Sequence, residues 1–325
     1  MALHKPTGRW QLGFSLSLVT AFFWGVLPLA IQQVLTTIDA MTLIWFRFIV
    51  AALFVTGLLW QKKRLPKLRG RGIRSYALIT VATIGLLLNY IFFTLGLHWT
   101  TPETAQVLIQ LSPLMFLGGS VLIFGERLSL MQVVGMVITL AGFTLFFQHK
   151  FADMLQFSSR YAGGVGMLLL AGIGWAAYAL AQKQLLTEMP SPAVMLLIYS
   201  GSAALMSFSA HPAAIGTLTG VGIALLIFTA VNTIVAYGAF AEALQHWEAS
   251  RVSAVLSITP IITIITVAGA HSIWPTDIPY EPFPQLSYVG AALVVGGSML
   301  TSLGKGRRTP TVEKPILDKH LVSSK

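Results

Sequence analysis

The chain has 325 residues, of which 55% are hydrophobic and 10% charged, with no cysteine and a formal net charge of +10. A water-soluble core cannot bury that much apolar surface, so the composition excludes an ordinary soluble domain and favours an all-α integral membrane protein. The absence of cysteine excludes a fold held by disulfides.

Apolar runs of about 20 residues, the length that crosses the hydrocarbon core as a helix, recur along the chain. They predict ten membrane-spanning helices, at 11–34, 41–60, 75–96, 101–123, 130–148, 161–185, 192–210, 218–243, 249–269 and 285–303. The first run is longer than the apolar part of a secretory signal and has no clear cleavage site. We therefore expect it to remain in the protein.

Basic residues fall on one side of these spans. With a cytoplasmic N-terminus, all but three of the 21 Lys and Arg residues lie in cytoplasmic segments. The exceptions are Lys150 and Arg160 in an outer loop and Arg47 within the second span. This distribution follows the positive-inside rule and accounts for the net charge without a nucleic-acid partner. Both termini are predicted to be cytoplasmic.

The second half of the chain repeats the first. The matched positions are Tyr90, Phe93, Leu97 and Pro113 with Tyr237, Phe240, Leu244 and Pro260, at a constant offset of 147, and Trp24, Gly135 and Gly142 with Trp175, Gly290 and Gly297. Each half holds five spans, so the two copies have opposite orientations, as in transporters built from inverted repeats. The glycine pairs place small residues on one helix face, where they let two helices approach closely.

Charge supports the inversion. Residues 62–74, between the second and third spans, carry seven basic residues, whereas their counterpart at 211–220 carries none. The predicted units are a cytoplasmic N-terminus at 1–10, a five-helix repeat at 11–148, a linker loop at 149–160, an inverted five-helix repeat at 161–303, and a cytoplasmic tail at 304–325.

Two tryptophans, Trp24 and Trp175, occupy equivalent places near the middle of the first and sixth spans. Tryptophan usually lies at the membrane interfaces, so at this depth it either lines a cavity or fills the helix bundle, and we favour the cavity. Trp175, Tyr178 and Gln182 are spaced at i, i+3 and i+7 and share one helix face. We predict that Trp24, Trp175 and Tyr178 contact a substrate.

The fourth and ninth spans carry the same polar pattern. Gln106, Gln110 and Pro113 are spaced at i, i+4 and i+7, and Ser253, Ser257 and Pro260 repeat that spacing. A proline removes a backbone hydrogen bond, and broken helices near the midplane are where many transporters bind substrate. We predict substrate contacts at Gln106, Gln110 and Ser257, with hinges at Pro113 and Pro260. The alternative is that Gln and Ser only join helices by hydrogen bonds.

Asn89 and Tyr90 in the third span and Tyr237 in the eighth add further hydrogen-bonding groups. We predict that they line the transport path, with Tyr90 and Tyr237 near opposite mouths; packing alone is the alternative. Pro28, in the first span, is a candidate hinge. Arg47 lies a few residues from the outer end of its span, and we favour the interpretation that it reaches the outer interface.

Several segments resemble a known family. A first span with FFWG, a tyrosine before Gly-Leu near the end of the third span, a proline within the fourth and the run GERLSLMQVVGMVITLAG are similar to the EamA-type drug/metabolite transporter superfamily. The likeness covers about residues 11–303 and is greatest for bacterial amino acid exporters of the YddG type. The second copy differs, with Gly269, Ala270 and His271 in place of Gly125 and Glu126. The resemblance implies efflux of small metabolites, foremost amino acids, through the inner membrane.

The expected function is therefore a membrane carrier that exports amino acids of broad variety by alternating access. No acidic residue lies at mid-depth to carry a proton, so we expect facilitated transport without ion coupling. A proton-coupled drug or metabolite antiporter and a channel are the alternatives. An enzyme is not expected, because the chain lacks H-E-x-x-H and G-x-S-x-G motifs and cysteine. We expect no metal, cofactor or obligatory protein partner, only the substrate and the lipid bilayer.

Overall fold

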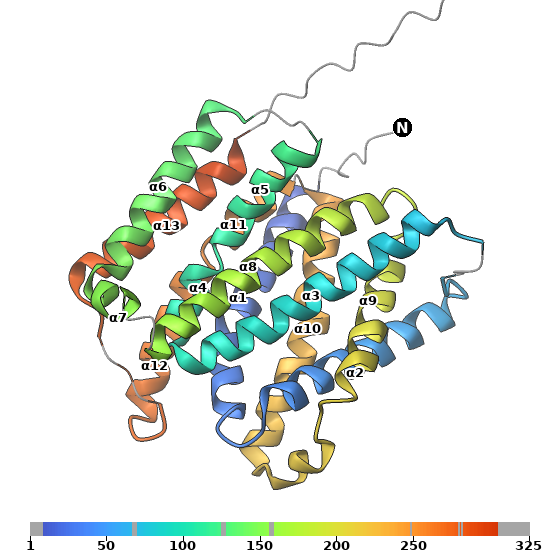
Figure 1. The fold of residues 1–325 in the computed structure, drawn as a ribbon, viewed down its shortest axis with the longest axis horizontal. Coiled ribbons are helices and arrows are strands. Elements are labelled where there is room, and N and C mark those ends of the chain that lie inside the picture. The colour runs from blue at the N-terminus through green and yellow to red at the C-terminus, as the bar shows by residue number, and fades with distance from the viewer. Residues whose placement is uncertain are drawn as a thin grey trace, which may run out of the picture.

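The computed structural model describes residues 9–66, 70–124, 128–155, 159–247, 249–278, 280 and 282–304, and within these residues every regular element is a helix (Figure 1). The expected N-terminal segment before residue 9, the tail after Gly304, and Gly125 with Glu126 lie outside the described residues. The helices form a bundle in which most elements run obliquely side by side (Figure 1).

The long helices are α1 (Trp10–Val34), α2 (Ala40–Gln61), α3 (Ile73–Trp99), α6 (Leu130–Phe147), α8 (Arg160–Leu185), α9 (Ser191–Met206), α10 (Gly220–His246) and α13 (Gln285–Leu303). Shorter helices are α4 (Pro102–Leu108), α5 (Leu111–Phe124), α7 (Phe151–Leu155), α11 (Ala249–Leu256) and α12 (Thr259–Ile273), with 3-10 turns η1 (Gln148–Lys150) and η2 (Pro212–Thr217).

Nine helical segments among the described residues are long and apolar enough to cross a membrane, counting α4 with α5 and α11 with α12 as single spans. The tenth expected span is α9, which has 16 residues and ends at Met206 rather than at residue 210. Its length is about 24 Å. The chain turns after Met206 and reaches Pro212, whose ring restricts the backbone before η2. The expected linker loop at 149–160 also differs, because it contains α7.

Two spans are broken next to the prolines that the sequence analysis singled out. α4 ends at Leu108 and α5 begins at Leu111, two residues before Pro113. α11 ends at Leu256 and α12 begins at Thr259, directly before Pro260. Because proline has no N–H, it cannot bond the carbonyl four residues earlier, and the helix is interrupted there. The side chain of Thr259 donates to the Leu256 carbonyl instead.

The long helices pack in pairs that join the two halves of the chain: α3 with α8, α1 with α10, α2 with α9, and α6 with α13. Figure 1 shows α6 and α13 side by side at one end of the bundle and α2 with α9 at the other. The broken span α4–α5 packs on α8 through α5, and the broken span α11–α12 packs on α1. The two breaks thus lie between the α6–α13 pair at one end of the bundle and the α2–α9 pair at the other.

Glycine determines how closely α6 and α13 approach. A Cβ added at Gly142 would lie 2.6 Å from the Val294 backbone nitrogen, and one at Gly297 would lie 2.5 Å from the Thr139 backbone nitrogen. Any larger side chain would collide with backbone, which cannot move aside cheaply. The expectation that these glycines allow close helix contact is confirmed.

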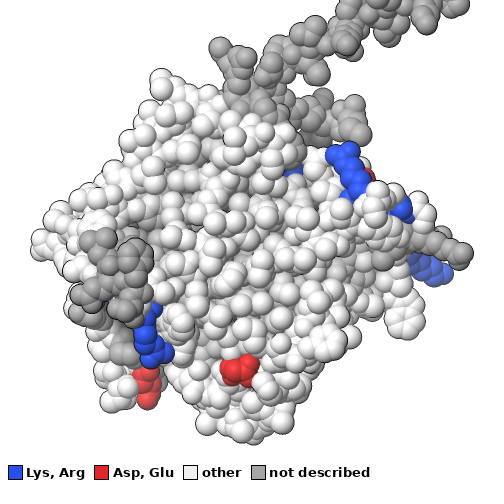
Figure 2. Space-filling model, viewed as in Figure 1, with Lys and Arg blue, Asp and Glu red and all other residues white. Residues whose placement is uncertain are grey.

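The outer surface of the bundle is apolar. Large hydrophobic side chains such as Leu53, Phe54, Ile123 and Val137 are more than half exposed. Figure 2 shows a broad surface free of charge, with Lys, Arg, Asp and Glu atoms only near its margins. A surface of this kind is expected to face lipid tails rather than water.

Candidate functional site

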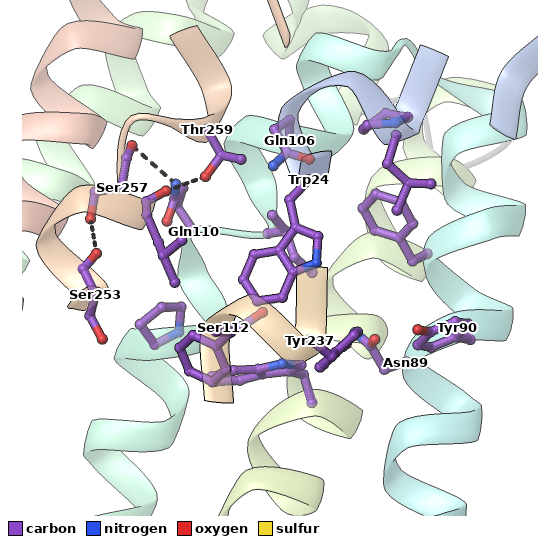
Figure 3. Close-up of a pocket in the computed structure, with 18 of the residues that line it drawn as sticks. Trp24, Asn89, Tyr90, Gln106, Gln110, Ser112, Tyr237, Ser253, Ser257 and Thr259 are labelled. Carbon is purple, nitrogen blue, oxygen red and sulfur yellow. Dashed lines mark hydrogen bonds between the residues drawn. The ribbon is translucent and has the colours of Figure 1, made fainter. Parts of the chain in front are cut away.

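A cavity of about 210 Å³ lies inside the bundle, where both helix breaks meet the long helices. Residues from α1, α2, α3, α4, α5, α8, α10, α11, α12 and α13 line it. Figure 3 shows Trp24 near the centre of this group, with Gln110 and Ser257 to one side and Asn89 and Tyr90 to the other. The volume is small beside typical ligand pockets of about 300–1,000 Å³, which suits a small metabolite.

Most of the residues predicted from the sequence line this cavity: Trp24, Pro28, Asn89, Tyr90, Gln106, Gln110, Pro113, Trp175, Tyr237 and Ser257. They come from six helices and the two breaks, and they were singled out by different signals, among them repeat position, helical spacing and proximity to proline. The fold brings them around one space.

The two helix breaks are joined by hydrogen bonds. Gln110 Nε2, in the first break, donates to the Ser257 carbonyl in the second at 3.3 Å. Ser298 on α13 donates to Gln110 Oε1 at 3.4 Å, and the Ser257 hydroxyl lies 3.2 Å from the Ser298 hydroxyl. Part of the alternative interpretation therefore applies, because these side chains join helices. They also face the cavity (Figure 3).

Aromatic rings form much of the remaining wall. The Trp24 ring meets Tyr237 edge to face, with centroids 5.4 Å apart, and lies 5.8 Å from Phe240. Trp175, also in the lining, packs against Phe116 outside it, with ring centroids 6.3 Å apart. Such rings give a rigid apolar surface on which a ligand side chain can pack.

Two predicted placements differ in the structure. Tyr178 is buried outside the cavity lining, where its hydroxyl lies 3.5 Å from Met195 Sδ on α9, the same sulfur that Gln182 contacts. Pro260, predicted as a hinge, is buried at the start of α12, directly after the second break, and its hinge role stays a prediction. Tyr90 and Tyr237 do not mark opposite mouths, since both line the same space.

The interpretation of Arg47 was wrong. Its side chain does not reach an outer interface: the residue is 4% exposed and lines the cavity from α2. Nε donates to Thr233 Oγ1 on α10 at 3.1 Å, and the guanidinium carbon lies 4.6 Å from the centre of the Tyr90 ring. A position in the sequence gives depth along a helix but not the direction in which a long side chain extends.

Several hydroxyls of the cavity lining were not predicted, and two of them are distinctive. Thr94 and Ser112 both line the cavity, and their side-chain oxygens are buried without a hydrogen-bond partner among the described residues. The available signals were weak: Thr94 follows Tyr90 by one helical turn, and Ser112 directly precedes Pro113. Buried hydroxyls normally have a partner, so these two are candidates for contact with a ligand.

Chemically, the cavity combines aromatic walls, uncharged amides and hydroxyls, and one cation. No Asp or Glu is among the described residues that line it. Glu103, at the start of α4, is 3% exposed but is not part of the lining. The arrangement can bind a small organic molecule by packing and hydrogen bonds. It lacks the paired carboxylates or the nucleophile with a base that hydrolytic chemistry requires.

Comparison with known proteins agrees with a transporter. An uncharacterized transporter of Haemophilus influenzae is 38% identical over 90% of this chain and 95% of its own length. The uncharacterized inner membrane transporter YhbE of Escherichia coli K12 is 36% identical over 90% of this chain and 92% of its own. A probable amino-acid metabolite efflux pump of Salmonella typhimurium is 23% identical over 64% of this chain and 70% of its own length.

A solved crystal structure shares the fold, with a TM-score of 0.63 at 17% identity over 90% of this chain and 96% of the other. The model of the EamA-like transporter family matches residues 11–148 and 162–303, most of the chain. Family and relatives alike indicate a membrane transporter rather than an enzyme. The chain therefore belongs to the EamA-like transporter family.

Proposed function

We propose that the protein is an inner membrane carrier built from two inverted five-helix repeats, in which α9 completes a set of ten spans. The two segments that match the family model, 11–148 and 162–303, nearly coincide with the repeats expected from the sequence. An odd number of spans in each copy gives the copies opposite orientations. The termini of the chain are then both cytoplasmic, in agreement with the positive-inside rule.

The packing of helices supports this symmetry. In the proposed repeat, α3 is equivalent to α10 and α8 to α1, so the α3–α8 and α10–α1 contacts are equivalent. The contact of α5 with α8 has its counterpart in that of α12 with α1. The α2–α9 and α6–α13 pairs each join equivalent helices. A two-fold axis in the membrane plane would produce this set of pairs.

The observation that carries the carrier function is the cavity between the two breaks, with Gln110 of one break bonded to Ser257 of the other. In transporters with inverted repeats, the substrate lies near the midplane at the repeat interface, beside discontinuous helices. Alternating access then requires one repeat to rock against the other around this site. We place the substrate among Trp24, Gln106 and Trp175.

Amino acids of broad variety are the proposed substrates, and export is the proposed physiological direction. The Salmonella relative named as a probable amino-acid metabolite efflux pump supports this class. A cavity walled by rings, neutral polar groups and a single arginine has few features that would select one substrate side chain over another. Broad acceptance of small apolar substrates follows.

The proposed transport is facilitated and has no obligatory ion coupling, since the described lining holds no carboxylate to carry a proton. One observation favours the proton-coupled antiporter as a second candidate. Glu103 is a carboxylate only 3% exposed within a predicted span, and buried acids in spans are commonly functional.

Counterflow tests the carrier. Proteoliposomes of the pure protein are loaded with one unlabelled compound from a panel of amino acids, sugars, nucleosides and amines, and entry of the labelled compound is followed. The proposal predicts saturable counterflow with amino acids. Flux that neither saturates nor responds to loading indicates a channel, and counterflow confined to the other classes removes amino acids.

A pH gradient separates the two coupling models. Facilitated transport predicts that an imposed gradient drives no accumulation of substrate above its external concentration. Accumulation that is lost in Glu103→Gln, with counterflow retained, would establish the proton-coupled antiporter instead.

A further inference from the structure

Arg47 is a cation placed in the wall of the cavity. It is the eighth of the 22 residues of the apolar span α2, and it is 4% exposed. A charged side chain within a span is expensive unless it is paired with an acid or fully hydrogen-bonded. The contacts of Arg47 should therefore show what balances its charge.

Those contacts leave most of the guanidinium unused. The group has five N–H donors, and only the one on Nε has a hydrogen-bond partner among the described residues, Thr233 Oγ1. The Thr233 hydroxyl donates its own hydrogen to the Thr229 carbonyl at 3.0 Å, and its oxygen is therefore free to accept the hydrogen bond from Arg47. The Tyr90 ring, 4.6 Å away, stabilises the cation but accepts no hydrogen bond in the guanidinium plane. No carboxylate in the described chain forms an ion pair with Arg47.

The hydroxyls of Thr94 and Ser112 provide a second, independent observation. Both are nearly fully buried, at 0% and 2% exposure, both line the cavity, and neither has a hydrogen-bond partner in the described structure. An unpaired buried hydroxyl destabilises the protein, so a ligand that accepts from it recovers that loss. The cavity thus presents unsatisfied donors of two kinds, one of them charged.

An anion with two coplanar acceptors matches the terminal nitrogens of a guanidinium, and a carboxylate has that geometry. The rest of the lining combines uncharged amides and hydroxyls with aromatic and aliphatic side chains, with Trp24, Phe93 and Trp175 among its rings. An ammonium group would find no acidic side chain in the described lining and would be repelled by Arg47. The favoured ligand is a carboxylate joined to a small apolar or aromatic body.

We propose, resting on the carrier function above, that Arg47 binds the carboxylate of the transported molecule and that an amino group is dispensable. Small aromatic and aliphatic monocarboxylates are then substrates alongside amino acids, and amines and amides are excluded. Thr233 is a positioning residue, because it holds Nε and so orients the terminal nitrogens toward the cavity.

Four phenyl compounds test the proposal by calorimetric titration of the purified full-length protein: phenylalanine, 3-phenylpropionate, phenylalaninamide and phenethylamine. The two carboxylates are expected to bind, and the amide and amine to bind at least tenfold more weakly. Arg47→Gln should lower the affinity for both carboxylates by about tenfold to a hundredfold, because it removes the charge-assisted hydrogen bonds. The affinity of Arg47→Lys for the carboxylates should lie between those of the wild type and Arg47→Gln, since lysine keeps the charge but lacks the two parallel N–H donors of the guanidinium.

Arg160→Gln is the matched control, because it removes one positive charge at an exposed position at the start of α8, outside the cavity. It should leave all four affinities unchanged. Melting temperature and elution volume show whether Arg47→Gln folds; if it does not, the comparison of Arg47→Lys and Thr233→Val with the wild type replaces it, with weakening expected for the carboxylates only.

The proposal is overturned if the amide and amine bind the wild type as tightly as the acids, if none of the four binds, or if folded Arg47 variants bind the acids unchanged. If phenylalanine binds and 3-phenylpropionate does not, the claim that the amino group is dispensable is wrong. The carrier function is judged separately, by wild-type counterflow: a protein that exchanges substrates but fails these tests is a carrier with a different recognition rule.

Discussion

Gln110 and Ser257 stand 147 residues apart, and the side chain of one bonds the backbone of the other across the cavity wall at 3.3 Å. The same separation relates every matched pair from Tyr90–Tyr237 to Pro113–Pro260. Residues on a two-fold axis meet their own counterparts, so this contact is expected if the axis passes between the two helix breaks. It gives the proposed repeat a specific centre.

This contact leads to the first prediction. Gln110→Ala removes the bond to Ser257 and the acceptor for Ser298, which should cost about 1 kcal/mol per hydrogen bond and slow counterflow several-fold. Ser298→Ala removes the bonds of Ser298 to Gln110 and Ser257 but keeps the direct Gln110–Ser257 bond between the two breaks, so it should slow counterflow less. Initial rates of counterflow at equal protein density measure both. A higher counterflow rate in Gln110→Ala would contradict this prediction, because it would mean that the hydrogen bonds of Gln110 slow transport.

The second prediction separates cavity residues from core residues on one helix. Trp175→Ala should reduce substrate affinity roughly tenfold through lost apolar contact, while membrane insertion stays intact. Tyr178→Phe, three residues further along α8, is the control: its hydroxyl lies 3.5 Å from Met195 Sδ, outside the cavity lining, so transport should be unchanged. Concentration dependence of uptake decides. Normal uptake by the Trp175 variant would remove that ring from the site.

The comparison of these two residues shows how far sequence reasoning goes. Helical spacing correctly placed Trp175 and Tyr178 on neighbouring parts of one face, but that face meets both the cavity and α9, and spacing cannot divide them. Proline positions located both helix breaks because the lost backbone donor is a local property. The orientation of Arg47 was missed because it depends on Thr233, 186 residues away.

The third prediction concerns the α6–α13 contact. Gly142→Ala places a Cβ 2.6 Å from the Val294 backbone nitrogen and should destabilise the protein by about 1–3 kcal/mol, seen as a lower melting temperature in detergent. Gly166 in α8 has no atom within 4 Å of an added Cβ, so Gly166→Ala should be neutral or stabilising by up to about 1 kcal/mol. Equal effects of the two substitutions would contradict the tight interface.

The fourth prediction is a pH dependence at Asp39, in the loop before α2. Its carboxylate accepts from the Thr42 backbone and hydroxyl at 3.0 and 2.6 Å and lies 3.6 Å from His211. Burial raises the pKa of Asp39, but the hydrogen bonds from Thr42 and the charge of His211 outweigh it, so the pKa lies below its usual 3.8.

A lowered pKa means that ionised Asp39 stabilises the fold fully above about pH 4, and that this stabilisation is lost as the pH falls through the folded-state pKa. The melting temperature of the wild type should therefore exceed that of Asp39→Asn at neutral pH, with the gap closing only in acid. Asp153→Asn, in an exposed pair with Lys150, should show little gap at any pH. A gap that widened in acid would reverse the assigned sign.

The membrane topology of two loops tests the inverted carrier most directly. The chain has no cysteine, so single replacements at exposed Lys62, between α2 and α3, and exposed Thr217, before α10, report without background. With a membrane-impermeant maleimide on intact cells, Thr217→Cys should be labelled at once and Lys62→Cys only after the membrane is opened. Labelling of both from the same side would contradict the opposed orientation of the two halves.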